Sequence, residues 1–119
     1  MKKFTDWMNE GVSTRHAEQM FLFTKRLMLA DGTSLSIQAG EGKYCTPRRN
    51  PDVQDYDFFQ EFEIGFPSRE IQEIMTYAEE PERPTETVYG YVPKKVIRNM
   101  VEARGGVIGY DSKLLEVEG

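Results

Sequence analysis

One stretch gathers the side chains best suited to recognise a ligand: GEGKYCTPRRNP. Glycine, proline and asparagine favour turns, so we expect a surface loop held on a rigid scaffold. Tyr44 offers a ring for stacking, and Arg48 and Arg49 offer two guanidinium groups. This combination suits a phosphate, a carboxylate or a base. The alternative is that Tyr44 packs inward and the arginines pair with nearby acids such as Asp52 or Asp55.

A second candidate site lies where the fourth expected strand meets the last expected helix. Strand alternation predicts that Tyr89 and Tyr91 share one face. Lys94, Lys95 and Arg98 crowd the first turns of the helix, where the macrodipole disfavours cations. An anion or an acidic partner surface would offset that cost. The alternative is a set of solvated cations beside packed tyrosines.

The inventory for catalysis is thin. Cys45 and His16 are the only cysteine and histidine, and they lie far apart in the sequence. A single residue of each type does not supply the ligands of a usual zinc site, and no phosphate-binding glycine motif occurs. Glu61 and Glu63 are expected on the solvated face of a strand. We therefore predict a protein that is not an enzyme, without metal or cofactor, in which Cys45 is a small buried anchor for its loop.

A short helix is expected near the amino terminus. Phe4, Trp7 and Met8 follow the i, i+3, i+4 spacing of one helical face. An isolated helix of this length is marginal in water, so this face must dock on the core, on a partner or on a second copy of the chain. A homodimer is one expected arrangement.

An acidic connector follows the third expected strand and its helix. Glu79, Glu80 and Glu82 lie in the sequence EEPERP, which is charged and stiffened by proline. The connector is either a solvated run or an acidic surface for a basic protein partner.

Hydrophobic periodicity and turn residues define the remaining elements. They are, in chain order, a hairpin over residues 20–39 turning at Asp31 and Gly32, a strand over 58–66, a helix capped by Ser68 that ends before Pro81, a strand over 85–92, a helix from Pro93 to Gly105, and a short strand over 107–110. In the strand over 58–66, alternation places Phe62, Ile64 and Phe66 inward and Phe59 outward. The polar side of the hairpin's second strand is expected to face solvent.

These elements predict an α+β fold: a largely antiparallel sheet of about four strands with two helices packed on one face, plus the amino-terminal helical arm. The 119 residues suffice for one domain. We assign residues 1–19 to the arm, 20–110 to the domain and 111–119 to a tail.

Charge and hydropathy narrow the setting. The formal net charge of −5 makes direct nucleic-acid binding unfavourable, because that binding depends on cations that neutralise phosphates. The sequence contains no signal peptide and no run of ~20 apolar residues, so we expect a cytoplasmic protein without a membrane segment.

A resemblance adds context. Small uncharacterised accessory proteins of tailed bacteriophages are similar to this chain over about residues 27–107, in the segments LMLADGTSLSIQAGEGKYCTPR, FEIGFPS, YAEEPERPTETVYGYVP and RGGV. The resemblance implies a protein that acts in an infected bacterial host by binding and blocking a host component, commonly a defence system.

Two function classes follow. The first is an inhibitor of anti-CRISPR type that binds a host defence protein through the acidic connector and the aromatic arm. The second is a protein that sequesters a nucleotide signal of a host defence system. Its pocket would be lined by Tyr44, Arg48, Arg49, Tyr89, Tyr91 and Lys94.

Overall fold

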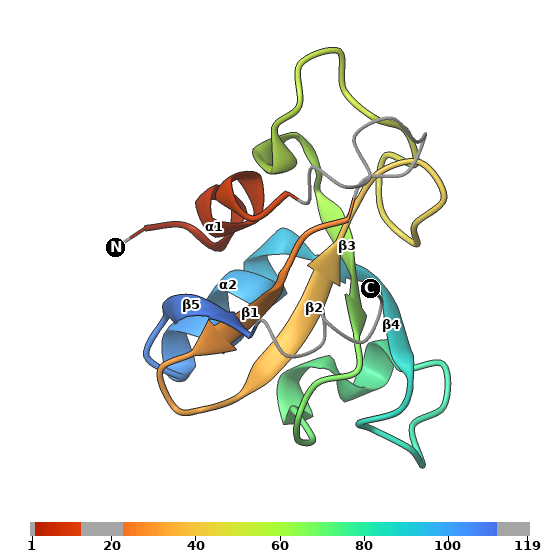
Figure 1. Ribbon diagram of the computed structural model, residues 1–119. Coiled ribbons are helices and arrows are strands. Elements are labelled where there is room, and N and C mark those ends of the chain that lie inside the picture. Colours follow the sequence, from red (N-terminus) through yellow and green to blue (C-terminus); the bar gives the residue numbers. More distant parts are fainter. Residues whose placement is uncertain (1, 13–22, 112–119) are drawn as a thin grey trace.

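The computed structural model describes residues 2–12 and 23–111, which fold around a five-stranded antiparallel sheet (Figure 1). The strands are β1 (Arg26–Leu29), β2 (Ser34–Gln38), β3 (Glu61–Gly65), β4 (Val88–Pro93) and β5 (Val107–Asp111), in the spatial order β4-β3-β2-β1-β5. The helices are α1 (Phe4–Glu10), α2 (Lys94–Ala103) and the 3-10 helices η2 (Tyr56–Phe58) and η3 (Gln72–Tyr77). The predicted α+β class is confirmed, with one strand more than expected.

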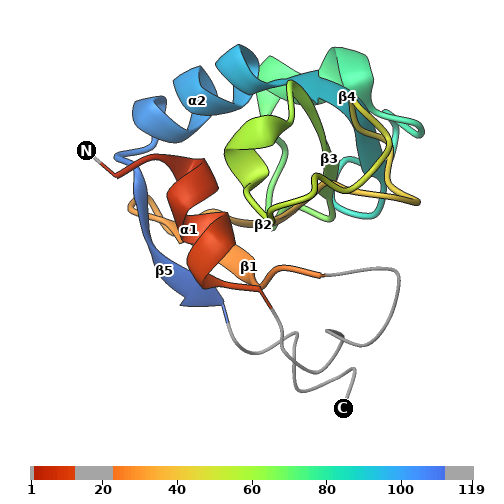
Figure 2. The same ribbon diagram turned by 90° about the horizontal axis from the view of Figure 1, so that it is seen from above.

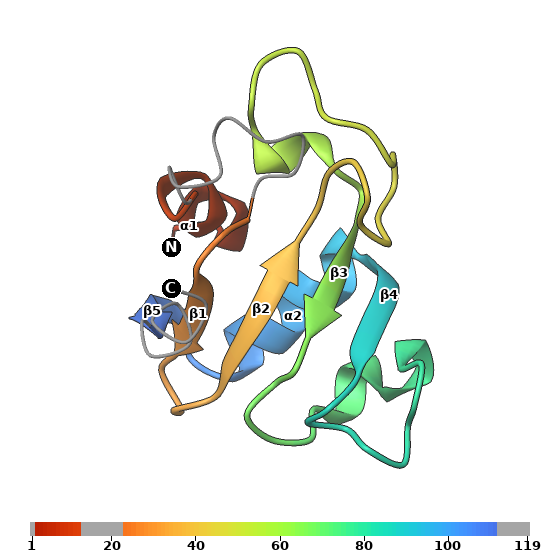
Figure 3. The ribbon, with the colours of Figure 1, turned by 45° about the vertical axis from the view of Figure 1, so that its right-hand side comes forward.

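The core lies between one face of the sheet and the helices. α2 runs behind the sheet in Figure 3, and α1 lies on the same side in Figure 2. The buried side chains of α2 are Ile97, Met100 and Val101, which follow the i, i+3, i+4 spacing of one helical face. Gly105 ends the helix with a φ of +87°, a conformation that favours glycine.

The predicted hairpin is confirmed in its described part. Leu27 pairs with Leu35 across antiparallel strands, and Gly32 has a φ of +94° in the turn. The polar side of β2, however, is not solvated as expected. Ser34 and Gln38 are only 4% and 7% exposed, because the Ser34 hydroxyl accepts a hydrogen bond from Arg26 and Gln38 bonds to the backbone of Thr24.

The burial of two phenylalanines around β3 is the reverse of that expected. Phe62 and Ile64 are buried as predicted, but Phe59 is also fully buried and Phe66 is 51% exposed. Phe59 lies before the strand begins and packs edge-on against Phe58 and Phe62. Phe66 lies beyond the strand end, where its φ of +47° breaks the alternation. The period of two therefore applies only to residues that pair in the ladder.

The helix predicted after Ser68 is replaced by the 3-10 helix η3. Ile71 and Ile74 are buried as the spacing suggests. Ser68 does not cap a helix; its hydroxyl accepts a hydrogen bond from the Ser34 N–H at 2.9 Å, and its own N–H donates to the Ser34 carbonyl at 2.8 Å. Ser68 is thus bound to the sheet.

α1 packs against the core of its own chain. Phe4 contacts Phe62 edge-on with ring centroids 5.3 Å apart, and Met8 is fully buried. The Tyr110 hydroxyl of β5 donates to the Trp7 carbonyl at 2.6 Å. Of the three docking sites expected for this face, the core of the same chain is therefore the one confirmed. Phe4 and Met8 are not accessible to a partner or a second copy, so the homodimer loses its structural basis.

Other predictions for the two ends of the chain fall on residues 13–22 and 112–119, outside the described residues. They include His16 and the first part of the hairpin. Across residues 2–12 and 23–111, no helix has both the length and the apolarity needed to cross a bilayer.

Candidate binding surface

The loop between β2 and β3 is anchored by Cys45. The thiol is fully buried, its sulfur accepts a hydrogen bond from the Gly40 N–H at 3.2 Å, and it lies 3.3 Å from the carbonyl oxygens of Gly40 and Pro47. Burial raises the pKa of Cys45 above its ordinary value, against the opposing hydrogen bond from Gly40 and the charge of Arg48. A buried thiol of raised pKa is a poor nucleophile. The structural role expected for Cys45 is confirmed.

Above this anchor, Tyr44, Arg48 and Tyr91 form an exposed cluster, here called the Tyr-Arg patch. Tyr44 and Tyr91 are 40% and 41% exposed, with ring centroids 6.1 Å apart and planes tilted by 40°. The guanidinium carbon of Arg48 lies 5.6 Å from the centroid of the Tyr44 ring. Its Nε donates to the carbonyl of Lys43 at 3.1 Å. The patch thus joins residues from two segments of the chain.

A β-bulge in β4 positions Tyr91. On β3, Phe62 and Ile64 are two residues apart, but their partners on β4, Val92 and Tyr89, are three apart. The extra residue is accommodated where Tyr91 has a φ of +55°. Val92 and Tyr89 consequently both face the core, and Tyr91 is exposed. The prediction that Tyr89 and Tyr91 share a face is wrong.

Tyr89, which was expected to bind a ligand, is not accessible to one. It is fully buried, and its hydroxyl donates to the Pro84 carbonyl. Burial, followed by the charge of Glu70, raises its pKa. Its role is to fix the connector between η3 and β4.

Main-chain hydrogen bonds fix the Tyr-Arg patch from below. The Tyr91 N–H donates to the Tyr44 carbonyl at 3.0 Å, and the Tyr44 N–H donates to a carboxylate oxygen of Glu63 at 3.0 Å. Gly90 permits the close approach, since a Cβ there would lie 3.2 Å from the Tyr44 Cβ. Both rings are therefore presented by backbone that is already ordered.

Arg49 points elsewhere. Its guanidinium lies 5.0 Å from the centroid of the Phe58 ring, so it does not join Arg48. Among the residues that the structure describes, neither arginine forms an ion pair with Asp52 or Asp55. The loop thus offers one arginine to the patch.

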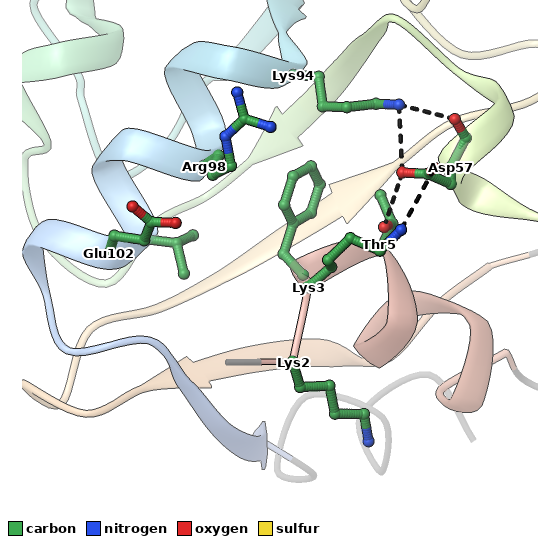
Figure 4. A pocket seen from close by; sticks show the side chains of 9 residues that line it. Lys2, Lys3, Thr5, Asp57, Lys94, Arg98 and Glu102 are labelled. Atoms are coloured by element: carbon green, nitrogen blue, oxygen red, sulfur yellow. Dashed lines mark hydrogen bonds and ion pairs between the residues drawn. The ribbon is translucent and has the colours of Figure 1, made fainter.

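Lys94 and Arg98 line a separate cavity of about 80 Å³ between residues 2–5 and α2 (Figure 4). The Lys94 ammonium donates to the Asp57 carbonyl at 2.7 Å and lies 3.3 Å from its carboxylate. Burial opposes the ionisation of Asp57, but the hydrogen bond and charge of Lys94 and the charge of Lys3 outweigh it and lower its pKa. Lys94 and Arg98, predicted to share one site with Tyr91, therefore lie in a different place from that tyrosine.

The acidic connector remains accessible. Glu79, Glu80 and Glu82 are all exposed. The connector is ordered by the sheet, since the Glu79 N–H donates to the Val88 carbonyl at 3.0 Å. Arg83 of the connector forms an exposed ion pair with Glu86 at 2.8 Å.

Two residues that line the cavity could not be identified from the sequence. Lys3 and Asp57 line the cavity although about fifty residues separate them, and neither belongs to a motif. In the described part of the chain, no three His, Cys, Asp or Glu side chains are grouped so that they could hold a metal ion.

Comparison of this chain with protein-family models, with curated proteins and with solved structures found no match.

Proposed function

We propose that this protein is a non-enzymatic inhibitor that binds and blocks another protein through the Tyr-Arg patch. The observation that carries the proposal is the exposure of Tyr44, Arg48 and Tyr91 side by side on an ordered backbone. Tyrosine and arginine are enriched among the residues that dominate binding energy in protein interfaces. A surface that is ordered before binding also loses less entropy on association.

The backbone of Tyr91 supports the same proposal. A left-handed conformation costs a residue with a Cβ about 1–2 kcal/mol, and here it serves to expose a large aromatic side chain. Unfavourable backbone conformations of this kind cluster at functional sites.

The class of target comes from the resemblance to phage accessory proteins. It supports a defence protein in the cytoplasm of an infected bacterium as the partner. The acidic connector, Glu79, Glu80 and Glu82, would supply a second contact if that partner carries a basic surface.

Two charge-matched variants test the patch. Arg48→Ala and Arg49→Ala each remove one exposed arginine from the same loop, but only Arg48 belongs to the patch. Purified wild-type and variant proteins would be used to capture a partner from host lysate, and the captured protein would be identified. We expect Arg48→Ala and Tyr91→Ala to weaken capture at least about tenfold, as for interface residues of high energetic weight, and Arg49→Ala to leave it unchanged.

A plating assay tests the biological role. Expression of the wild-type chain in a host with an active defence system should restore plating of a sensitive phage, and Arg48→Ala should abolish this effect. Equal capture and equal plating by Arg48→Ala and Arg49→Ala would refute the proposal.

A nucleotide signal is the second candidate ligand, because Tyr44 and Tyr91 place stacking rings beside the guanidinium of Arg48. Two observations favour it less. The rings are tilted by 40° and do not form a parallel slot, and the cavity at Lys94 is well below the ~300 Å³ of ordinary small-molecule sites.

Thermal melting with a panel of linear and cyclic nucleotides separates the two candidates. A tight ligand at a hundredfold excess over its dissociation constant adds about 2.7 kcal/mol of stability. An increase in melting temperature that Tyr91→Ala removes would favour sequestration over protein binding, and no increase with any nucleotide would exclude it.

A further inference from the structure

The cavity between residues 2–5 and α2 combines an apolar floor with a cationic rim. Phe4 and Val101 form part of its wall and are each 5% exposed. The cations that line it, Lys3, Lys94 and Arg98, come from two separate segments, the amino-terminal residues and α2 (Figure 4). An apolar wall with a few convergent polar groups is the usual composition of a small-molecule site.

The cations of the rim are only partly neutralised. Lys94 and Lys3 share one carboxylate, Asp57, at 3.3 Å and 3.5 Å, and that carboxylate also accepts a hydrogen bond from Thr5. Within residues 2–12 and 23–111, the side chain of Arg98 forms no hydrogen bond or ion pair. It is therefore the cation with most freedom to bind a ligand.

Two other charged residues, Lys2 and Glu102, line the cavity, and neither forms an ion pair with Arg98 in the described part of the chain. The ammonium of Lys2 lies 2.6 Å from Glu10 and 4.1 Å from the centroid of the Trp7 ring, so it is engaged away from the rim. Glu102 is an exposed carboxylate on α2. The remaining charges at the cavity are three cations, Lys3, Lys94 and Arg98, and two carboxylates, Asp57 and Glu102. Their net charge is +1, whereas the net charge of the whole chain is −5.

We infer that this cavity binds a small carboxylate that carries a short apolar body. The body would rest on Phe4 and Val101, and the carboxylate would accept hydrogen bonds from the guanidinium of Arg98, whose planar fork matches a carboxylate. The volume of about 80 Å³ admits a small branched side chain and excludes a whole nucleotide.

The same chemistry occurs in two sources. One is a free short-chain acid, and the other is the carboxyl-terminal residue of a polypeptide with an aliphatic side chain. The inference is independent of the proposed function, because no residue of the Tyr-Arg patch lines the cavity.

Titration of the ¹⁵N-labelled protein followed by NMR tests the site with defined probes. N-acetyl-leucine represents a peptide terminus, isovalerate represents a free acid, and N-acetyl-leucine amide is the neutral control. We expect saturable shifts at the amides of Phe4, Thr5 and α2 with at least one of the two acids. The neutral amide should bind at least about tenfold more weakly, because it lacks the charge-assisted hydrogen bonds. Tighter binding of N-acetyl-leucine than of isovalerate identifies a peptide terminus, and tighter binding of isovalerate identifies a free acid.

Arg98→Gln and Lys95→Gln form a matched pair for this titration. Both remove one exposed cation from the first turns of α2, but only Arg98 lines the cavity. Arg98→Gln should weaken binding at least about tenfold, and Lys95→Gln should change it less than about twofold. The absence of saturable shifts, equal effects of the two variants, or tighter binding of inorganic phosphate than of either acid would overturn the inference.

Discussion

Two buried tyrosines differ in whether their hydroxyl groups form a hydrogen bond. Tyr56 and Tyr89 are both fully buried. The Tyr89 hydroxyl donates to the Pro84 carbonyl, whereas the Tyr56 hydroxyl has no hydrogen-bond partner in the described part of the chain. A buried polar group without a partner retains its desolvation cost. The same substitution should therefore have opposite consequences at the two positions.

We expect Tyr56→Phe to leave the free energy of unfolding at neutral pH unchanged or to increase it by up to about 1 kcal/mol, because it removes an unsatisfied hydroxyl. Tyr89→Phe should lower it by about 1 kcal/mol, because it leaves the Pro84 carbonyl unpaired. Urea unfolding of both variants measures the difference. A loss at Tyr56 equal to that at Tyr89 would contradict this account.

Tyr56 also predicts how stability changes in alkali. Burial raises its pKa to about 12 from an ordinary value of 10.0. Between these values the unfolded chain releases the phenolic proton and the folded chain retains it, so rising pH favours unfolding. We expect a decline of about 2 kcal/mol between pH 10 and pH 12 from this residue. Urea unfolding across this range should show a smaller decline for Tyr56→Phe than for wild type.

Cys45 predicts slow chemical modification. Its thiol is buried and its pKa is raised by that burial, so little thiolate reaches solvent near neutral pH. Reaction with a thiol reagent should be at least about tenfold slower in the native protein than in denaturant. Equal rates would show that the loop opens freely and that the Tyr-Arg patch is not held in place.

At the scale of elements, the bulge in β4 links stability to binding. Tyr91 has a φ of +55°, a region in which glycine is not penalised and alanine is. Replacement of Tyr91 by glycine and by alanine removes the same ring. We expect Tyr91→Gly to be more stable than Tyr91→Ala by about 0.5–1 kcal/mol, which reverses the usual order in a strand.

Thermal unfolding of the two variants measures that order, and both variants should fail to capture the partner. Their comparison separates the effect of the backbone from the effect of the ring. If the alanine variant is the more stable one, Tyr91 does not have the left-handed conformation in solution.

The sequence predicts helices and strands correctly where hydrophobic periodicity agrees with the positions of glycine and proline. α2 begins directly after Pro93 and ends two residues before Gly105, and the hairpin turns at Gly32, because each of these residues restricts or permits a specific backbone conformation. The bulge was missed because the run Tyr89 to Val92 reads as regular alternation, and an extra residue in one strand appears only when its partner strand is known.

The sequence also predicts the Tyr-Arg patch only in part, because the position of one strand against another cannot be read from a single strand. Tyr44 and Arg48 are close in sequence, and their association in one loop was expected. Tyr91, expected to line the same pocket as Tyr44 and Arg48, does join them, and the register of β3 and β4 sets its position; Arg98 instead lines a separate cavity between α2 and residues 2–5. Contacts distant in sequence depend on tertiary packing, which local patterns do not encode.

At the scale of the whole molecule, α1 packs into the same core as the sheet. Met8 is fully buried and Trp7 packs against Tyr110 with ring centroids 5.5 Å apart. Trp7 is the only tryptophan, so its fluorescence reports on α1 alone, while circular dichroism reports on all elements. We expect the two signals to change together in urea, as in a two-state transition. Separate transitions would show that α1 is an independent arm.

Met8→Ala should shift both signals to lower urea and cost about 2–5 kcal/mol, the usual range for a fully buried methionine. Glu10→Ala is the control on the same helix. It removes only an exposed ion pair with Lys2, so it should cost less than about 1 kcal/mol.

The covering of β4 has a consequence for solubility. β4 is an edge strand, and its outer side is occupied by hydrogen bonds from Glu79 to Val88 and from Tyr91 to Tyr44, and by a bridge between Ala78 and Tyr89. An uncovered edge would offer a template for strand addition and aggregation. The loop that presents the Tyr-Arg patch therefore also shields the sheet, so selection for a more adaptable binding loop would be opposed by selection against self-assembly.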